Sequence, residues 1–412
     1  MTDIQKENKS GGKVPNRGGS VNFPRLRFPE FEGEYRQYSF EDLFLFSTGK
    51  NIKQNEASPE YETPCVRYGE LYHLYNEIIS EVVNKTNLDK SDLTFSIGNE
   101  ILLPSAGEDP LDIGSASALT IKGVAIGRTI NILRPLKKNL YSNIYVSYYI
   151  NEKLKKKIST LAKGVSISNV YNSDLKILNA LLPSISEQQK ISSFLLLINS
   201  RIQTQNKIIN DLKTLKTATA KKIFLQELRL KDDNGNDFPE WEVREVGEVF
   251  KITRGNVLAM NLVSNQCNEK NTYPVYSSQT KNNGLAGYYT DFLFEDAITW
   301  TTDGANAGDV NYRSGKFYCT NVCGVLISNE GYANSCIAEL INSVSKNYVS
   351  YVGNPKLMNG VMSEIKIPFP SLPEQTKIAN FLSAIDSKID MENQLLQKLE
   401  EQKKYLLQNM FV

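Results

Sequence analysis

Apolar residues recur with helical spacing in two long stretches of the chain. Within each stretch they step alternately by four and three positions, with occasional gaps. In the first stretch they are Ile191, Leu195, Ile198, Ile202, Ile209 and Leu212, and in the second Ile378, Leu382, Ile385, Ile389, Leu396, Leu399, Leu406 and Met410. This pattern predicts two amphipathic helices with a heptad seam, each about 40 residues long.

Both predicted helices begin with the same phrase. "PSISEQQKISSFL" starts at Pro183 and "PSLPEQTKIANFL" at Pro370, 187 positions later, and 8 of the 13 positions are identical. Ser184 and Ser371 each precede a Glu by three positions, which is the spacing of a capping box at a helix N-terminus. Two further pairs occur in the same order, "FPEF" with "FPEW" and "SDLKI" with "SEIKI". Three ordered anchors indicate an ancestral duplication.

Between the anchors lie two regions that scarcely resemble one another. Both are rich in short β-type runs, such as "LTIKGVAIG" and "AITWTTDG", separated by Gly, Asn and Asp turns. We therefore predict an α+β fold with mixed or mainly antiparallel sheets. The predicted organisation is a disordered tail (1–23), a first α+β domain (24–183), a central helix (184–230), a second α+β domain (231–369) and a C-terminal helix (370–412).

Polar residues interrupt both seams at equivalent places. Gln205 corresponds to Glu392 and Lys216 to Lys403 at the offset of 187. Polar residues in a seam cost stability and commonly fix the register. We predict an antiparallel pair of helices in which Gln205 faces Lys403 and Lys216 faces Glu392. Alternatively, the helices splay at these positions or the polar residues lie on a flank.

Composition narrows the chemistry that the chain could perform. A net charge of +1 over 412 residues argues against a DNA mimic, which would be strongly acidic. The single histidine excludes sites that need two, and five cysteines form neither a disulfide framework nor a zinc pattern. No phosphate-binding loop or complete amino-methyltransferase motif occurs, so we predict a non-enzyme without a bound cofactor or metal. Without a membrane span or a signal sequence, a cytoplasmic protein is expected.

Two unlike domains on a stiff helical spacer suit a rigid target with two separated features, and duplex DNA is such a target. The phrases "LRFPEFEG", "TPCVRYGELYHLYNEII", "VYSSQTKNNGLAGYY", "ITWTTDGANAG" and "PSLPEQTKIANFLSAIDSKI", together with the duplication, resemble the specificity (S) subunit of type I restriction-modification enzymes over about residues 24–412. The resemblance implies two target-recognition domains that each read half of a bipartite, asymmetric site. It also implies a pseudo-two-fold arrangement with an antiparallel coiled coil as spacer.

The same resemblance implies the partners. Besides double-stranded DNA, they are two methyltransferase (M) subunits and, through the complex, restriction and translocation (R) subunits. S-adenosylmethionine, ATP and Mg would then belong to those subunits. Two other readings are a single-chain DNA methyltransferase or nuclease with two recognition domains, and a coiled-coil scaffolding protein. The first would need catalytic motifs that are absent here, and the second leaves the polar loops of two unlike domains unexplained.

Candidate DNA-contacting residues lie in polar loops between strand-like runs. Their side chains offer the hydrogen-bonding groups that read base edges, or positive charge for phosphates. Each loop could equally be an ordinary solvated turn. The candidates are Arg67, Tyr68, Lys163, Ser166, Ser278, Gln279, Lys281, Asn282, Thr301, Thr302 and Asp303.

Overall fold

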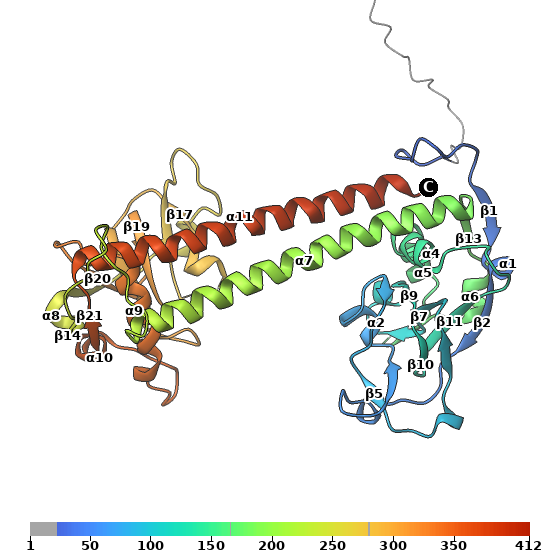
Figure 1. Cartoon of the computed structure of the whole chain (residues 1–412), viewed down its shortest axis with the longest axis horizontal. Coiled ribbons are helices and arrows are strands. Elements are labelled where there is room, and N and C mark those ends of the chain that lie inside the picture. Colours follow the sequence, from blue (N-terminus) through green and yellow to red (C-terminus); the bar gives the residue numbers. More distant parts are fainter. Residues whose placement is uncertain (1–22, 165, 279–280) are drawn as a thin grey trace, which may run out of the picture. The chain divides into compact units, whose positions relative to one another are not determined.

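The computed structural model describes residues 23–164, 166–278 and 281–412 (Figure 1). Its contacts divide the chain into two units, which are considered separately below. The first unit comprises residues 1–204 and 396–412, and the second comprises residues 205–395. Of the predicted tail, residues 1–23, only residue 23 is among the described residues.

The first unit is built on a five-stranded mixed sheet. In spatial order its strands are β2 (Phe44–Thr48), β11 (Ile130–Pro135), β7 (Glu100–Pro104), β9 (Ser117–Leu119) and β4 (Ile78–Ile79). Neighbouring strands are antiparallel except β4 and β9. The central strand β7 is buried at every position, so its apolar run "ILLP" forms the middle of the domain.

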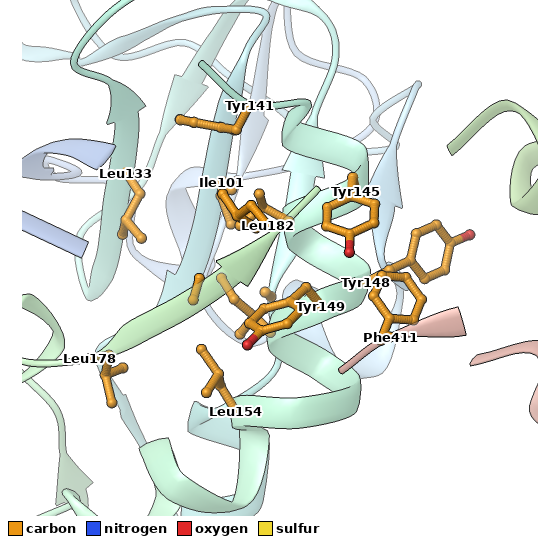
Figure 2. Close-up of a cluster of buried hydrophobic side chains, with 14 of the residues drawn as sticks. Ile101, Leu133, Tyr141, Tyr145, Tyr148, Tyr149, Leu154, Leu178, Leu182 and Phe411 are labelled. Carbon is orange, nitrogen blue, oxygen red and sulfur yellow. The ribbon is translucent and has the colours of Figure 1, made fainter. Parts of the chain in front are cut away.

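A smaller sheet lies beside it in the same unit. Its order is β5 (Lys85–Thr86), β3 (Thr63–Val66), β10 (Lys122–Ile126) and β6 (Phe95–Ile97), and only β3 and β10 run parallel. Helix α4 (Asn143–Tyr149) supplies three tyrosines to the main core (Figure 2). Core residues labelled there include Ile101, Leu133, Tyr145, Tyr148, Tyr149, Leu178, Leu182 and Phe411.

The second unit has one larger mixed sheet. Its order is β15 (Lys251–Arg254), β20 (Cys323–Ile327), β18 (Phe294–Thr301), β19 (Val310–Cys319), β16 (Tyr273–Tyr276) and β17 (Leu285–Tyr289). Only β16 and β19 are parallel. Helix α9 (Ser335–Ser345) packs its apolar face into the core around the buried Trp300. Both units are therefore of the predicted α+β class.

Each unit also has a two-stranded sheet at the entrance to a long helix. In the first unit it pairs β1 (Arg36–Ser39) with β13 (Asn179–Leu182), and in the second β14 (Glu242–Glu245) with β21 (Lys366–Phe369). In both cases the strand that follows the FPE anchor is antiparallel to the strand that precedes the PS anchor. The predicted duplication is thus confirmed in the fold.

The two long helices are α7 (Ile185–Phe224) and α11 (Leu372–Met410). In the first unit, the beginning of α7 shares a core with the end of α11, and in the second unit the end of α7 shares one with the beginning of α11. The predicted antiparallel pairing is therefore confirmed within each unit. The residues involved are Ile191, Leu195 and Ile198 with Leu406 and Met410, and Ala220 and Ile223 with Ile378 and Leu382.

Helix α7 ends six residues before the predicted boundary at 230. Gln226 adopts a left-handed conformation with φ of 57°, which ends the helical path. In the part of the chain that the structure describes, no helix combines the length and the apolar character needed to cross a bilayer.

Candidate nucleic-acid interface

A cavity of about 550 Å³ opens on the first domain beside strand β3. Its wall combines positive charge with aromatic rings, which is the chemistry that binds phosphates and stacks on bases. Two of the predicted residues, Arg67 and Tyr68, meet there. The charged and aromatic residues of the wall are Lys53, Arg67, Tyr68, Glu70, Tyr72, His73 and Arg128, of which only Glu70 is acidic.

Arg67 is held in place by a buried carboxylate. The Arg67 Nε donates to Glu70 Oε1 at 2.7 Å, and the Arg67 backbone N–H donates to Glu70 Oε2 at 3.2 Å. Asn84 also donates to Glu70, which is only 6% exposed. Tyr68, by contrast, is 40% exposed. Glu70 therefore fixes the loop while Tyr68 remains accessible to a ligand.

The second domain has a smaller, polar cavity of about 270 Å³ beside strand β19, with Arg313 in its wall. Arg313 is 8% exposed and lies 3.8 Å from the centre of the Tyr276 ring. It donates to the Thr299 hydroxyl at 3.1 Å and to the Asn283 carbonyl at 2.7 Å. Burial lowers the pKa of Arg313. No carboxylate among the described residues forms an ion pair with it, so this charge is compensated by dipoles and a π-face.

Arg313 thus holds Asn283, which follows the predicted residues Ser278, Gln279, Lys281 and Asn282 in the sequence. The Ser278 carbonyl accepts a hydrogen bond from Asn306 at 3.0 Å, and Asn282 is exposed with φ of 51°. Gln279 lies outside the described residues, and so does the side chain of Lys281.

Of the two predicted threonines, Thr302 is fully buried, so its hydroxyl is not presented to a base edge in this conformation and that prediction is wrong. Thr301 is 8% exposed and lines the polar cavity beside Arg313, so its contact with DNA stays a prediction. The Thr302 hydroxyl donates to Asp303 at 2.7 Å and accepts from Arg254 at 3.1 Å. Asp303 remains partly exposed but also lies 3.6 Å from Arg254, which makes it part of an internal polar network.

Lys163 and Ser166 lie elsewhere in the first domain. Lys163 forms an ion pair with Asp174 at 2.7 Å, and together with the Tyr171 backbone N–H it lowers the pKa of that carboxyl. Ser166 is exposed. Neither residue lines the cavity that contains Arg67.

Sequence reasoning missed the role of the glutamates in the repeated phrase. Glu187 and Glu374, 187 positions apart, are each 1% exposed in the first turn of a long helix. Glu187 accepts hydrogen bonds from Arg27 at 2.8 Å and from the Tyr35 hydroxyl at 3.1 Å. The sequence did contain one signal for this role, because Glu occupies the same position in both copies of the repeated phrase.

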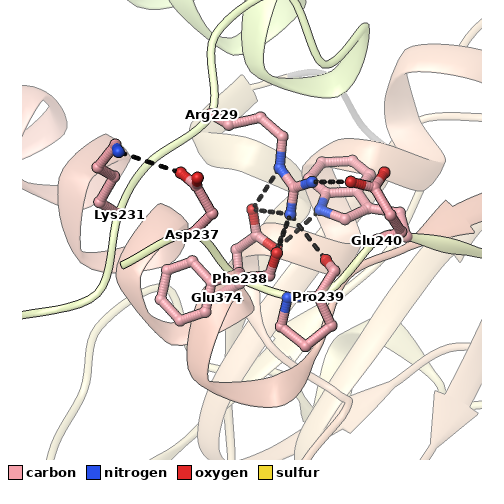
Figure 3. Close-up of polar contacts among 8 residues, drawn as sticks. Arg229, Lys231, Asp237, Phe238, Pro239, Glu240 and Glu374 are labelled. Atoms are coloured by element: carbon pink, nitrogen blue, oxygen red, sulfur yellow. Dashed lines mark hydrogen bonds and ion pairs between the residues drawn. The ribbon is translucent and has the colours of Figure 1, made fainter. Parts of the chain in front are cut away.

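In the second unit Glu374 is bound in the same way, and we call each of these arrangements the glutamate clamp (Figure 3). Glu374 accepts from Arg229 at 3.1 Å and from the Trp241 indole N–H at 2.8 Å. Arg229 also donates to the carbonyls of Phe238 and Pro239, in the FPE anchor. The anchors therefore recur because each segment before a domain is tied to the helix that follows that domain.

The glutamines beside them bind the domains to the helices. Gln188 donates to the Pro183 carbonyl at 2.9 Å and accepts from the Ser142 N–H, where α4 begins. Gln375 donates to the Pro370 carbonyl at 2.7 Å and accepts from Asn334, the N-cap of α9. The repeated "EQ" is thus a docking contact for one helix of each domain.

The predicted pairing of the polar seam residues is wrong. Gln205 donates to the side chain of Glu392 at 2.6 Å and to its backbone carbonyl at 3.0 Å, rather than facing Lys403. Lys216 is bound by Glu339 of α9 and by Asp386, both at 2.9 Å. Lys403 lies 3.4 Å from Glu77 of the first domain. Both equivalent lysines attach a long helix to a globular domain, and Lys216 also binds Asp386 on the facing helix α11.

A family model for the type I restriction modification DNA specificity domain matches this chain twice, over residues 32–214 and 239–401. Each match covers one α+β domain and most of the long helix that follows it. The chain belongs to this family. The resemblance found in the sequence is confirmed.

Relatives of this specificity chain carry corresponding names. It is 40% identical over 141 residues to the N-terminus of the candidate type I specificity subunit S.MpnORF289P of Mycoplasma pneumoniae, covering 34% of this chain and 74% of that one. It is 34% identical over 171 residues to the specificity subunit of the type I restriction enzyme MpnII of the same organism. This match covers 40% of this chain and 50% of that one.

A solved structure has the same fold as the specificity chain. The S subunit of a type I restriction-modification system from M. genitalium matches with a TM-score of 0.62 at 19% identity. The match covers 95% of this chain and 99% of that one.

Proposed function

We propose that this chain is the non-catalytic DNA-recognition subunit of a type I restriction-modification complex. The observation that carries the proposal is the double match of the specificity-domain model, one domain and one long helix in each copy. Two domains with unlike loops on a shared scaffold suit a bipartite, asymmetric site. The family match does not favour a single-chain methyltransferase or nuclease, or a scaffolding protein.

The partners follow from the same assignment. The chain docks two methyltransferase subunits, and restriction and translocation subunits join through that complex. S-adenosylmethionine, ATP and Mg are bound by those subunits, and the complex acts on double-stranded DNA in the cytoplasm. A relative named as the specificity subunit of a type I restriction enzyme supports this assembly.

An exchange of one domain tests the proposal. The chain is produced together with its methyltransferase subunit, and the methylated sites in cellular DNA are mapped by sequencing. We expect a motif with two short halves at a fixed spacing. Replacing residues 32–182 with the equivalent region of a relative should change one half and preserve the other half and the spacing.

Two outcomes would contradict the proposal. One is a change of both halves after the exchange, which would mean that the domains do not read DNA separately. The other is methyl transfer by the purified chain alone, because a recognition subunit has no methyltransferase site of its own.

A further inference from the structure

The two domains share a backbone arrangement that their sequences conceal. In the first domain, the Lys50 N–H donates to the Ile126 carbonyl at 3.0 Å, and the Gly127 N–H donates to the Val66 carbonyl at 2.9 Å. These bonds join the loops that follow β2, β3 and β10. Three loops are therefore tied together at one edge of the domain.

The second domain repeats these bonds. The Asn256 N–H donates to the Cys319 carbonyl at 3.1 Å, and the Thr320 N–H donates to the Tyr276 carbonyl at 3.0 Å. The loops joined here follow β15, β16 and β19. Since β3–β10 and β16–β19 are each a parallel pair in a mixed sheet, the two sets of loops occupy equivalent places.

A glycine at the same place in each domain permits this close approach. A Cβ on Gly49 would overlap the carbonyls of Ile126 and Gly127, and one on Gly255 those of Cys319 and Thr320. We call these loops the three-loop edge. It comprises residues 49–52, 67–68 and 127–129 in the first domain, and residues 255–257, 277–278 and 320–322 in the second.

Backbone strain is concentrated at the edge of the first domain. Asn51, Ile52 and Thr129 have φ of 48°, 55° and 68°. Two of these residues are β-branched, for which left-handed backbone is a genuine outlier. Such strain persists where the surrounding structure fixes it, and it clusters at binding sites. This observation is independent of the shared hydrogen bonds.

The edges share a backbone but differ in the side chains that they carry. The first domain has cationic and aromatic residues where the second has two amides and two hydroxyls. Lys50, Asn256, Arg128 and Asn321 are all exposed. Counting positions along the equivalent loops gives the pairs Lys50 with Asn256, Arg67 with Ser277, Tyr68 with Ser278, and Arg128 with Asn321.

From these observations we propose that the three-loop edge of each domain is its base-reading element, with Arg128 and Asn321 as specificity-determining residues at equivalent positions. The proposal rests on the proposed DNA-recognition function and adds to it the surface that contacts the bases. A rigid backbone with interchangeable side chains lets two copies of one fold read different sequences.

The chemistry of the two side chains indicates which bases they read. Arg128 lines the cavity beside Tyr68, and no ion pair among the described residues involves it. A free guanidinium donates in a fork to the O6 and N7 atoms of guanine, whereas an Asn amide matches the N6 and N7 atoms of adenine. The half-site of the first domain should therefore contain a guanine read by Arg128, and that of the second an adenine read by Asn321.

Motif mapping of the complete complex tests this assignment. The full-length chain with its methyltransferase subunit is used, and methylated sites are sequenced for each variant. Arg128→Ala should make one guanine position degenerate, with discrimination at that position reduced about 10-fold or more. The rest of the motif and the spacing should stay unchanged. Asn321→Ala should relax one adenine position in the other half.

Arg128→Lys keeps the charge but loses the planar fork, and a lysine can still donate to guanine O6 and N7, so it should relax the same guanine position less than Arg128→Ala does. Arg128→Ala separates base reading from phosphate neutralisation. Weaker methylation of every site with an unchanged motif would overturn the base-reading assignment, because a phosphate contact carries no sequence information. Lys138→Ala, which removes an exposed charge away from the edge, is the matched control and should leave the motif unchanged.

The remaining outcomes are also decisive. If the wild-type complex yields no bipartite motif, the proposed function itself fails. If it does, and Arg128→Ala and Asn321→Ala both keep the full motif, the three-loop edge is not the reading surface. Thermal unfolding identifies a variant that has lost its fold. If Arg128→Ala has lost it, Arg128→Gln decides for the first domain, because its amide matches adenine and should shift that position from guanine towards adenine, whereas a retained guanine would overturn the assignment.

Discussion

Gln205 donates a hydrogen bond to Glu392, the residue at its own position in the second copy of the repeat. In an antiparallel pair of related helices, a residue meets its own counterpart only where the local two-fold axis crosses the pair. The contact therefore marks that axis. It also explains why the two residues differ, because an amide and a carboxylate pair better than two carboxylates.

Replacing Gln205 with Glu should make stability depend on pH. Hydrogen bonds from Lys388 and then from Gln205 lower the pKa of Glu392, so its contribution is present above the ordinary pKa and is lost as pH falls below it. In Gln205→Glu two carboxylates face each other and repel at pH 7, which should lower the thermal midpoint by a few degrees. Below about pH 5 one carboxyl protonates and the difference should shrink.

Thermal unfolding at pH 7 and pH 4.5 measures this effect. Gln203→Glu is the control, because it adds the same charge at an exposed position of the same helix. A pH-independent difference between Gln205→Glu and the wild type would contradict the assigned contact.

Loss of the buried clamp carboxylate should be costly. In Glu374→Gln the guanidinium of Arg229 and the indole of Trp241 keep a polar partner, but the exposed Glu240 is then the remaining carboxylate bound to Arg229 among the described residues. We expect a loss of about 2–3 kcal/mol in unfolding free energy, discounted because Arg229 is 21% exposed. Glu240, which contacts the same arginine but is 92% exposed, provides the control. Glu240→Gln should cost under about 0.5 kcal/mol in chemical denaturation.

The glycines of the three-loop edge should not tolerate alanine. In Gly255→Ala the new Cβ would overlap the carbonyls of Cys319 and Thr320, so the loops must separate. We expect a destabilisation of about 3 kcal/mol or more, measured by thermal unfolding. Gly360 has no neighbour within 4 Å of its would-be Cβ and lies in helix α10 (Asn359–Glu364). Equal effects of Gly360→Ala and Gly255→Ala would refute the steric argument.

Lys216 should stabilise the second unit through its two carboxylate partners. Lys216→Met should cost about 1 kcal/mol, since Glu339 and Asp386 are partly exposed. Burial lowers the pKa of Lys216, but the hydrogen bonds that its ammonium donates to the two carboxylates outweigh this and raise the pKa above its ordinary value. The contribution is therefore present at neutral pH and lost only as pH rises through that raised pKa. Lys213→Met, at an exposed position one turn away, should change stability little.

Phe411 should be essential for the first unit. It is 2% exposed and lies 5.0 Å from the ring of Tyr145. Phe411→Ala should destabilise by about 3–4 kcal/mol, the usual loss for a buried Phe. Tyr405→Ala, in helix α11 six residues earlier, is the control, because Tyr405 is 59% exposed. Limited proteolysis followed by mass spectrometry should show faster cleavage within residues 24–204 for Phe411→Ala only.

The sequence predicted the elements better than their contacts. Heptad spacing and the PSxxEQ phrase locate both long helices, since periodicity and capping are local properties. The register could not be obtained in the same way, because Lys216 and Lys403 are bound by carboxylates of the globular domains. Those carboxylates, Glu339 and Glu77, lie far away in sequence and give no local signal.

For the candidate DNA surface too, the sequence predicted some of the residues and missed others. Arg67, Tyr68 and Ser278 were predicted from loop chemistry alone, and the structure places them at equivalent loops of the two domains. Arg128 was overlooked because it stands alone after an apolar run. Thr302 has suitable chemistry but points inward, and burial of a polar residue inside a turn cannot be read from composition.

The packing of α11 against the first domain has a consequence for biosynthesis. The core of that domain includes Leu406, Met410 and Phe411, and the backbone N–H of Leu26 donates to the carbonyl of Asn409. The second unit is one continuous segment, residues 205–395, whereas the first domain needs the segment 396–412, which is translated after the whole of the second unit. The domain that is translated first therefore completes its core last, and a chain truncated at residue 395 would contain every residue of the second unit but would expose the core of the first domain to proteases and chaperones.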